Sequence, residues 1–171
     1  MDTLEKELIR FAFGTFALGT VLVAASAKGI AAIMMGDSEE KLRSELASAF
    51  PHVHLVADEI GLTGMVAQVA TFLDAPHNQL DLPLDIRGSK QEQAIWQALR
   101  KILPGETITY GEIAKTLTRP VTAQDVGAAC AANRLAVAIP CHRVVKADGS
   151  ISGYRWGVNR KRKLINREAV A

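Results

Sequence analysis

The charge of this chain reverses sign near its middle, and that reversal most constrains how the chain divides into modules. Residues 1–85 hold 5 Lys and Arg against 12 Asp and Glu, a net charge of −7. Residues 86–171 hold 15 against 6, a net charge of +9. This asymmetry predicts two modules, the second facing an anion such as nucleic acid, although solvated surface charge explains the same numbers. We place the boundary at Arg87-Gly88, where the sign changes.

The composition predicts a cytoplasmic protein with a mostly aliphatic core. Hydrophobic residues make up 49% of the chain, but aromatic residues only 5%. Two cysteines cannot build a disulfide framework, which favours a reducing compartment. His52 and His54 have no obvious third ligand nearby, so we expect no metal site. The uncharged stretch 11–27 lacks a positively charged n-region and is short for a membrane span, so we expect no membrane association.

The first module, residues 1–85, is predicted to be a small antiparallel sheet with helices. Apolar residues over 9–35 alternate or run together between glycine turns, which is typical of a β-meander. The pattern at Asp37 predicts a helix N-cap, and a second helix is expected over 63–73. Pro83 favours an edge strand or an extended linker before the boundary.

The second module, residues 86–171, is predicted to be mainly helical. The layout of short helix, turn and helix is typical of a helix-turn-helix, and the aromatic loop 151–157 would form a wing beside it. Helix packing without DNA explains this pattern equally well. A basic helix over 158–169 either binds phosphates or keeps the surface soluble. The helix starts are predicted by three polar capping patterns: Ser89 with Glu92, Thr109 with Glu112, and Thr122.

One pentapeptide, Ile139-Pro140-Cys141-His142-Arg143, indicates chemistry. A thiol becomes a nucleophile as the thiolate, which a nearby base or cation favours. Neighbouring side chains of a strand point to opposite faces, so His142 can reach Cys141 only if the backbone bends there. The alternative is a buried cysteine in a core strand. For Cys130, which lies among small residues without an adjacent base, we favour this core interpretation.

The residues around the pentapeptide resemble a known family. The segments Pro140-Cys141-His142-Arg143-Val144, Ala129-Cys130-Ala131-Ala132-Asn133 and Ser152-Gly153-Tyr154-Arg155-Trp156-Gly157 are similar to the O6-alkylguanine-DNA alkyltransferase family, and within it to the C-terminal domain of the bacterial Ada proteins. The resemblance covers most of the chain. It implies an α+β fold with a ribonuclease-H-like N-terminal domain and a winged helix-turn-helix-like C-terminal domain.

The resemblance also implies a function and a set of site residues. The function would be DNA repair by a monomer that transfers a methyl or other alkyl group, once and without a cofactor, from O6-alkylguanine in double-stranded DNA to Cys141. His142 would act as base through a water, Glu168 would orient it, Asn133 would hold the turn, and Tyr110 would assist the leaving base. Substrate-binding residues would be Tyr154, Arg155 and Trp156. DNA-binding residues would be Thr122, Ala123, Gln124, Gly127, Ala128, Ala131 and Arg134.

Three positions depart from the family pattern. Gln124 stands where the family has an arginine that enters the base stack, Asp125 where a small apolar residue is usual, and Gln91 where the family has phenylalanine. These changes favour weaker use of duplex DNA and keep a second hypothesis open, an alkyl acceptor that uses a small molecule or a free base. A non-enzymatic damage sensor is disfavoured, because sensors of that kind replace the cysteine that this chain retains.

Overall fold

A computed structural model describes residues 6–75, 77 and 79–170. The chain divides into two compact units, Met1–Ile86 and Arg87–Ala171. No helix within the described ranges is long and apolar enough to cross a membrane.

The first unit contains a four-stranded sheet with the strand order β3-β2-β1-β4. The predicted meander is confirmed, since β2 pairs antiparallel with both β1 and β3. The fourth strand was not anticipated, and it pairs parallel with β1, so the sheet is mostly rather than wholly antiparallel. The strands are β1 (Leu8–Phe16), β2 (Gly19–Ser26), β3 (Gly29–Gly36) and β4 (His54–Ala57).

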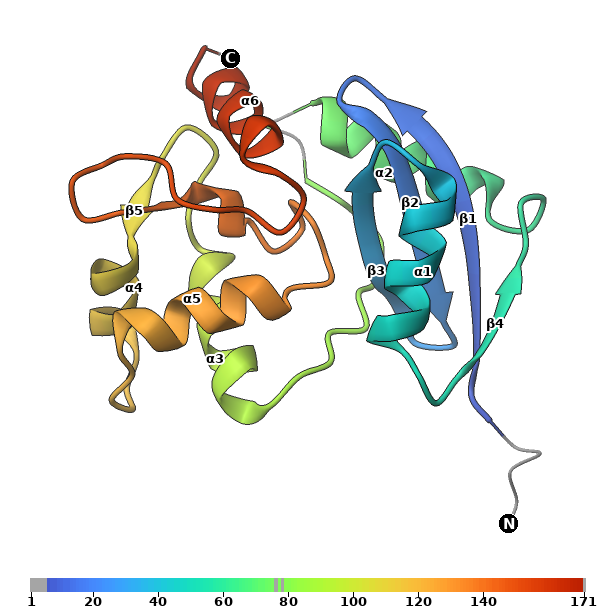
Figure 1. Cartoon of the computed structure of the whole chain (residues 1–171), viewed down its shortest axis with the longest axis horizontal. Helices are drawn as coiled ribbons and strands as arrows, with labels where there is room; N and C mark the ends of the chain where they lie inside the picture. Colours follow the sequence, from blue (N-terminus) through green and yellow to red (C-terminus); the bar gives the residue numbers. More distant parts are fainter. Residues whose placement is uncertain (1–5, 76, 78, 171) are drawn as a thin grey trace. The chain divides into compact units, whose positions relative to one another are not determined.

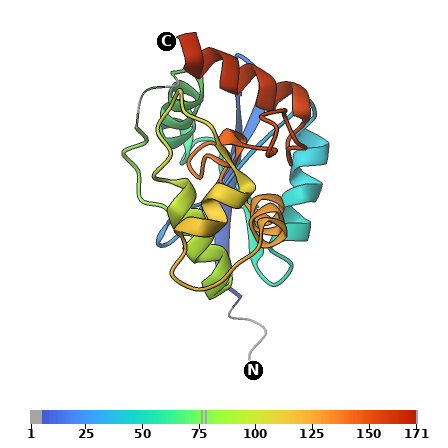
Figure 2. The same cartoon turned by 90° about the vertical axis from the view of Figure 1, so that its left-hand side faces the viewer.

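Two helices cover opposite faces of this sheet, α1 (Glu39–Ala49) and α2 (Thr63–Asp74) (Figures 1 and 2). Coverage on both faces explains why β2 and β3 are nearly continuous buried apolar runs rather than alternating ones. Helix α1 is capped by Ser38, whose side chain accepts a hydrogen bond from the Lys41 amide, and not by the predicted Asp37.

The extended segment with Pro83 lies at the edge of the same sheet. Ile30 of β3 donates its amide to the Pro83 carbonyl at 2.9 Å and accepts from the Asp85 amide at 2.7 Å. Proline fits there because an edge position does not require its missing N–H. The segment thus ends the first unit as a short parallel bridge.

The second unit consists of helices around a short parallel pair of strands, β5 (Ile108–Thr109) and β6 (Val144–Val145) (Figure 2). The three predicted capping patterns are all present, each with both side-chain-to-backbone hydrogen bonds. The helices are α3 (Lys90–Leu99), α4 (Tyr110–Thr116), α5 (Ala123–Ala132), the 3₁₀ turn η2 (Cys141–Arg143) and α6 (Val158–Val170).

Buried side chains of α3 fix the position of α5 in this unit. Trp96 is 2% exposed and donates its indole N–H to the carbonyl of Ala129 at 2.8 Å. Ala129 and Val126 are the buried residues of α5, so the opposite side of that helix is left at the surface. Together the two units confirm the predicted α+β class.

Candidate active site

Cys141 begins a single 3₁₀ turn, so the backbone bends where the sequence required it to bend. Pro140 precedes the turn with φ −81°, and Val144 continues from it as extended chain. The Cys141 side chain is 3% exposed. Because of this turn, Cys141 and His142 do not follow the geometry of a regular strand. The His142 side chain is directed toward α6, where it meets Glu168.

Asn133 connects the end of α5 to this turn through three hydrogen bonds. Its Nδ2 donates to the Ile139 carbonyl at 3.0 Å and to Cys141 Sγ at 3.2 Å. Its Oδ1 accepts from the Leu135 amide at 2.8 Å. Asn133 is completely buried, so these bonds satisfy an amide that would otherwise be costly to desolvate.

The loop between Asn133 and Cys141 contains a strained residue. Val137 has φ 67°, in the left-handed region that β-branched residues rarely enter. Such a conformation costs about 1–3 kcal/mol and persists only where the surroundings impose it. Here the loop is packed, with Leu135, Ala136 and Ile139 at 2% exposure or less.

Glu168 of α6 accepts hydrogen bonds from both residues that follow the cysteine. His142 Nε2 lies 2.8 Å from Glu168 Oε2, and Arg143 binds both carboxylate oxygens, each at 2.9 Å. Arg143 also donates to the Ile102 carbonyl at 2.6 Å. All three charged or polar side chains are buried, which makes this a satisfied internal network rather than a surface ion pair.

This network leaves His142 neutral with a free acceptor. Burial raises the pKa of Glu168, but the bonds from His142 and Arg143 outweigh it and bring that pKa to about 2. Burial lowers the pKa of His142 more than Glu168 raises it. A neutral imidazole that donates from Nε2 to a carboxylate has its lone pair on Nδ1. That Nδ1 is buried and has no hydrogen-bond partner among the described residues.

The second cysteine lies beside the first, which the core interpretation of Cys130 did not anticipate. Both cysteines are free, and both line one pocket. A hydrogen bond from the Cys130 thiol lowers the pKa of Cys141 against the opposing effect of burial, and Asn133 and Lys161 lower it further. The same bond raises the pKa of Cys130, so Cys130 stays a thiol donor while Cys141 gains thiolate character.

The pocket over the thiol has a volume of about 300 Å³. Tyr110, Tyr154 and Arg155 line it, whereas Trp156 is buried at 4% exposure and is not among its lining residues. Trp156 instead packs edge-on against Tyr154 at 5.4 Å between ring centroids. Arg155 donates to the Asn133 carbonyl at 2.6 Å, which ties the pocket wall to the cysteine turn.

The residues predicted to meet DNA gather on the outward side of α5 and at its two ends. Thr122, the N-cap, and Ala123, Gln124, Ala128 and Ala131 are exposed. Gly127 is partly exposed, and with Ala131 it also lines the pocket. Small side chains along this side allow close approach of another backbone or groove. Partly exposed Arg134 donates to the Arg87 carbonyl at 3.3 Å.

Two of the departures from the family pattern have local explanations. Asp125 closes a capping box with Thr122, accepting from the Thr122 amide at 2.8 Å while its own amide donates to Thr122 Oγ1 at 3.0 Å. The family's aromatic position is occupied by Gln91, which is exposed on the first turn of α3. Because Gln91 is exposed, its polar side chain leaves no unpaired polar group in the core.

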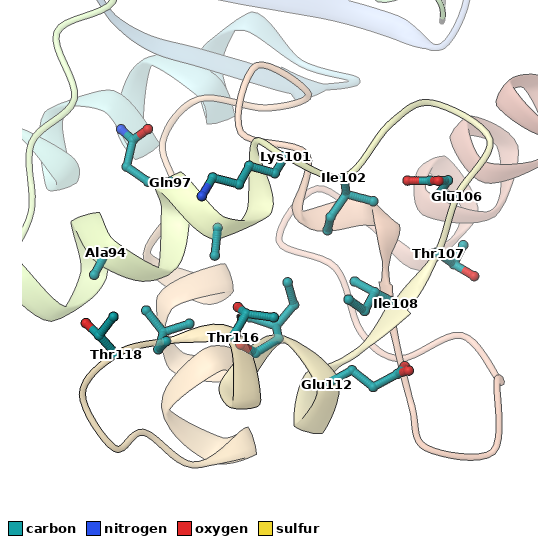
Figure 3. A pocket seen from close by; sticks show the side chains of 13 residues that line it. Ala94, Gln97, Lys101, Ile102, Glu106, Thr107, Ile108, Glu112, Thr116 and Thr118 are labelled. Atoms are coloured by element: carbon teal, nitrogen blue, oxygen red, sulfur yellow. Dashed lines mark hydrogen bonds between the residues drawn. The ribbon is translucent and has the colours of Figure 1, made fainter.

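A larger cavity of about 670 Å³ lies elsewhere in the same unit and contains none of the reactive residues (Figure 3). It is lined by residues of α3, of α4 and of the segments that follow each helix, and charged residues of both signs are among them, Lys101, Glu106 and Glu112. Among the residues with described positions, no group of three or more His, Cys, Asp or Glu is arranged to hold a metal ion.

Sequence reasoning missed Arg143, Ser152 and Lys161 as parts of this region. The position of Arg143 inside the pentapeptide 139–143 was the sequence signal that could have indicated its role. Lys161 looked like one of several basic residues on a solvent-facing helix, yet it is completely buried. Its Nζ donates to Ser152 Oγ at 2.8 Å, and Ser152 in turn hydrogen-bonds the Tyr110 hydroxyl.

The fold and site define a class of protein: a small α+β chain with a buried cysteine of lowered pKa beside a helix-turn-helix pair, α4 and α5. Comparison with known proteins agrees. The family profile described as "6-O-methylguanine DNA methyltransferase, DNA binding domain" matches residues 90–170. The chain is 46% identical over 165 residues to the bifunctional transcriptional activator and DNA repair enzyme Ada of Escherichia coli, covering 96% of this chain and 47% of that protein. The chain spans about half the length of the Ada relatives it matches.

Two further relatives are matched over most of their length. The methylated-DNA–protein-cysteine methyltransferase of Mycobacterium bovis is 40% identical over 115 residues, 67% of this chain and 70% of that protein. The crystal structure of Mycobacterium tuberculosis OGT in complex with DNA superposes with a TM-score of 0.78 at 31% identity, covering 94% of this chain and 93% of that one. The chain belongs to the methylated-DNA–protein-cysteine methyltransferase family, the O6-alkylguanine-DNA alkyltransferases.

Proposed function

We propose that this protein repairs DNA by direct, single-turnover transfer of a methyl or other alkyl group from O6-alkylguanine to Cys141. One observation carries the proposal: a cysteine with a lowered pKa lines a pocket of about 300 Å³ together with a tyrosine and with small residues of the partly exposed helix α5. A flipped base needs such a pocket, and a groove-binding helix needs such a surface.

The reaction proceeds as one displacement. The thiol proton of Cys141 passes to His142 Nδ1 through a water, and Glu168 stabilises the imidazolium that forms. The thiolate attacks the alkyl carbon, so an S–C bond forms while the C–O6 bond breaks. The electron pair of that bond stays on the guanine, and Tyr110 donates a hydrogen bond to the leaving base. The product is a thioether with no route back to the thiol, and the damaged DNA is the only alkyl donor required.

The second unit carries both the chemistry and the DNA contacts in this proposal. Its net charge of +9 over residues 86–171 attracts the phosphate backbone, and α5 lies in a groove. The substrate is double-stranded DNA containing O6-methylguanine, and the protein acts as a cytoplasmic monomer, where its unpaired thiols stay reduced.

The test is incubation with excess duplex containing O6-methylguanine, followed by proteolysis and mass measurement of the Cys141 peptide. We expect one added methyl group on Cys141, none on Cys130, and no transfer to Cys141→Ser. If the Cys141 peptide is still unmodified after prolonged incubation, the proposal is wrong.

Exposed Gln124, in place of an arginine, favours a second candidate, an alkyl acceptor that uses a small molecule or free base. The two differ in their salt dependence, because only duplex binding releases counterions. Methylation that needs duplex and weakens steeply with salt supports DNA repair. Equal rates with O6-methylguanine as a free base, insensitive to salt, support the second candidate.

A further inference from the structure

Cys130 is a second thiol at the active site, and the alkyl transfer described above uses it only as a hydrogen-bond donor. It is half-buried on α5, three residues before the C-cap Asn133. Cys130 and Cys141 line the same pocket, and both are free thiols. A cysteine with thiolate character beside a second thiol is the pattern of redox-sensing proteins, in which the second cysteine resolves the oxidised first one.

Asn133 holds the two cysteines next to each other. Its backbone amide donates to the Cys130 carbonyl at 3.2 Å, and its side-chain Nδ2 donates to Cys141 Sγ, also at 3.2 Å. Asn133 is completely buried, so both contacts are fixed by the packing around it. The two sulfurs already share a hydrogen bond, and closing it to a disulfide length of about 2.0 Å requires only a short approach of the two side chains.

We propose that Cys130 and Cys141 form a dithiol site that reduces hydroperoxides and closes into a reversible disulfide. The Cys141 thiolate attacks a peroxide oxygen, so an S–O bond forms while the O–O bond breaks and hydroxide leaves. The thiol of Cys130 then attacks the oxidised sulfur, so the S–S bond forms while the S–O bond breaks. Each hydroxide takes one of the two thiol protons. Two thiols and one hydrogen peroxide thus give one disulfide and two waters.

The pocket gives a small peroxide access to both sulfurs. Its volume of about 300 Å³ is several times the about 30 Å³ that a water molecule occupies in the liquid, and hydrogen peroxide is only slightly larger than water. Cys141 reacts first, because a thiolate is the nucleophile and the hydrogen bonds from Cys130 and Asn133 lower the pKa of Cys141.

Oxidation of Cys141 also prepares Cys130 for the second step. The hydrogen bond to Cys141, burial and the negative charge of Cys141 raise the pKa of Cys130, whereas the positive charge of Lys161 lowers it. A sulfenic acid on Cys141 carries no negative charge, so part of what keeps Cys130 protonated disappears. Cys130 therefore becomes a better nucleophile at the moment when its neighbour becomes an electrophile.

The disulfide would protect the alkyl acceptor. A sulfenic acid that meets more peroxide proceeds to sulfinic acid, which thiols do not reduce, whereas a disulfide returns to two thiols by exchange. While the disulfide is closed, Cys141 cannot accept an alkyl group. This inference goes beyond the proposed function, since it needs neither DNA nor an alkyl donor.

Cys130→Ser tests the proposal, because serine keeps a hydrogen-bond donor beside Cys141 but cannot form a disulfide. The reduced protein and the variant are treated with hydrogen peroxide, blocked with iodoacetamide and digested with trypsin. Cleavage after Lys115, Arg134 and Arg143 places the two cysteines in separate peptides, 116–134 and 135–143. We expect the unaltered protein to give these two peptides linked to each other and lighter by two hydrogen atoms.

The variant should differ in the second step and not in the first. We expect Cys141 of Cys130→Ser to begin oxidation at a rate within about twofold of the unaltered protein, and then to gain two oxygen atoms as sulfinic acid. Dithiothreitol should restore iodoacetamide labelling of Cys141 in the unaltered protein, and at least about fivefold less of it in the variant. Denaturant unfolding of both proteins checks that serine preserves the fold, and the linked peptides of the unaltered protein decide the matter if it does not.

Two results would overturn the dithiol site. One is sulfinic acid at Cys141 of the unaltered protein as fast as in Cys130→Ser, without linked peptides. The other is a disulfide that forms only between separate molecules, with a yield that rises with protein concentration. Because the assay contains no DNA, either result leaves the proposed alkyl transfer standing. Failure of methyl transfer from duplex would likewise leave the disulfide result unchanged.

Discussion

His142 Nε2 lies 2.8 Å from Glu168 Oε2, with the histidine 0% and the glutamate 3% exposed. The two residues are 26 positions apart in the chain and come from the cysteine turn and α6. The carboxylate therefore fixes the tautomer of His142 and links the reactive turn to the last helix.

The first prediction concerns Glu168→Gln. This change leaves Arg143 as a buried cation without its anion, which should reduce the free energy of unfolding by about 3 kcal/mol at pH 7. Because the pKa of Glu168 is lowered to about 2 in the folded protein, its stabilisation is complete above its ordinary pKa near 4.5 and is lost as pH falls toward 2. Denaturant unfolding of both proteins between pH 7 and pH 2 checks this. A stability difference that does not shrink with acid would contradict it.

The second prediction concerns Asn133→Ala. The change leaves the Leu135 amide and the Ile139 carbonyl buried without the side-chain bonds described above, and it removes a donor to Cys141 Sγ. We expect a loss of about 2–4 kcal/mol in unfolding free energy, measured with denaturant, and a higher pKa of the Cys141 thiol. Asn159→Ala, at an exposed position of α6, is the matched control and should be near neutral.

The third prediction concerns Cys130, whose thiol donates toward Cys141. Cys130→Ala should raise the pKa of Cys141, so that less thiolate is present at pH 7. The pH profile of the iodoacetamide reaction at Cys141 should therefore shift to higher pH. Cys130→Ser keeps a donor and should stay near the original profile. If alanine and serine shift the profile equally, the hydrogen bond is not the cause.

The fourth prediction concerns Gln124→Arg on the exposed side of α5. A guanidinium there can contact phosphate or fill the gap left by a flipped base, so methyl transfer from duplex should speed up by about tenfold at low salt. The logarithm of the DNA-binding constant should also fall more steeply with the logarithm of the salt concentration, by about one unit of slope. Gln124→Ala is the control. If Gln124→Arg transfers the methyl group no faster than Gln124→Ala, binding and flipping of the damaged base do not limit the rate.

Local signals in the sequence predicted much of this fold. The capping boxes that open α3, α4 and α5 involve residues three apart, so neighbouring sequence suffices to specify them. The pattern that predicted the β-meander is likewise specified by neighbouring residues. Strand β4 was missed because it has four residues and only half-buried or exposed side chains, so no apolar pattern marks it.

The site could be predicted only in part. The resemblance pointed to Cys141, His142 and Glu168, which the structure places in one connected region. The burial of Lys161 could not be read from a run of basic residues, because it depends on contacts with Ser152 and Gly153 in a loop whose path the sequence does not specify. The contact of Arg143 with the Ile102 carbonyl spans 41 positions and is equally non-local.

The position of Glu168 within three residues of the end of α6 has a kinetic consequence. Helix ends open more often than helix centres, and each opening of this last turn would release His142 and Arg143 together. In the proposed reaction, His142 is held as the base of Cys141 only while that turn is closed. Amide hydrogen exchange at the end of α6 would therefore measure how often His142 is held for the proposed reaction, even though Cys141 lies 27 positions before Glu168 in the chain.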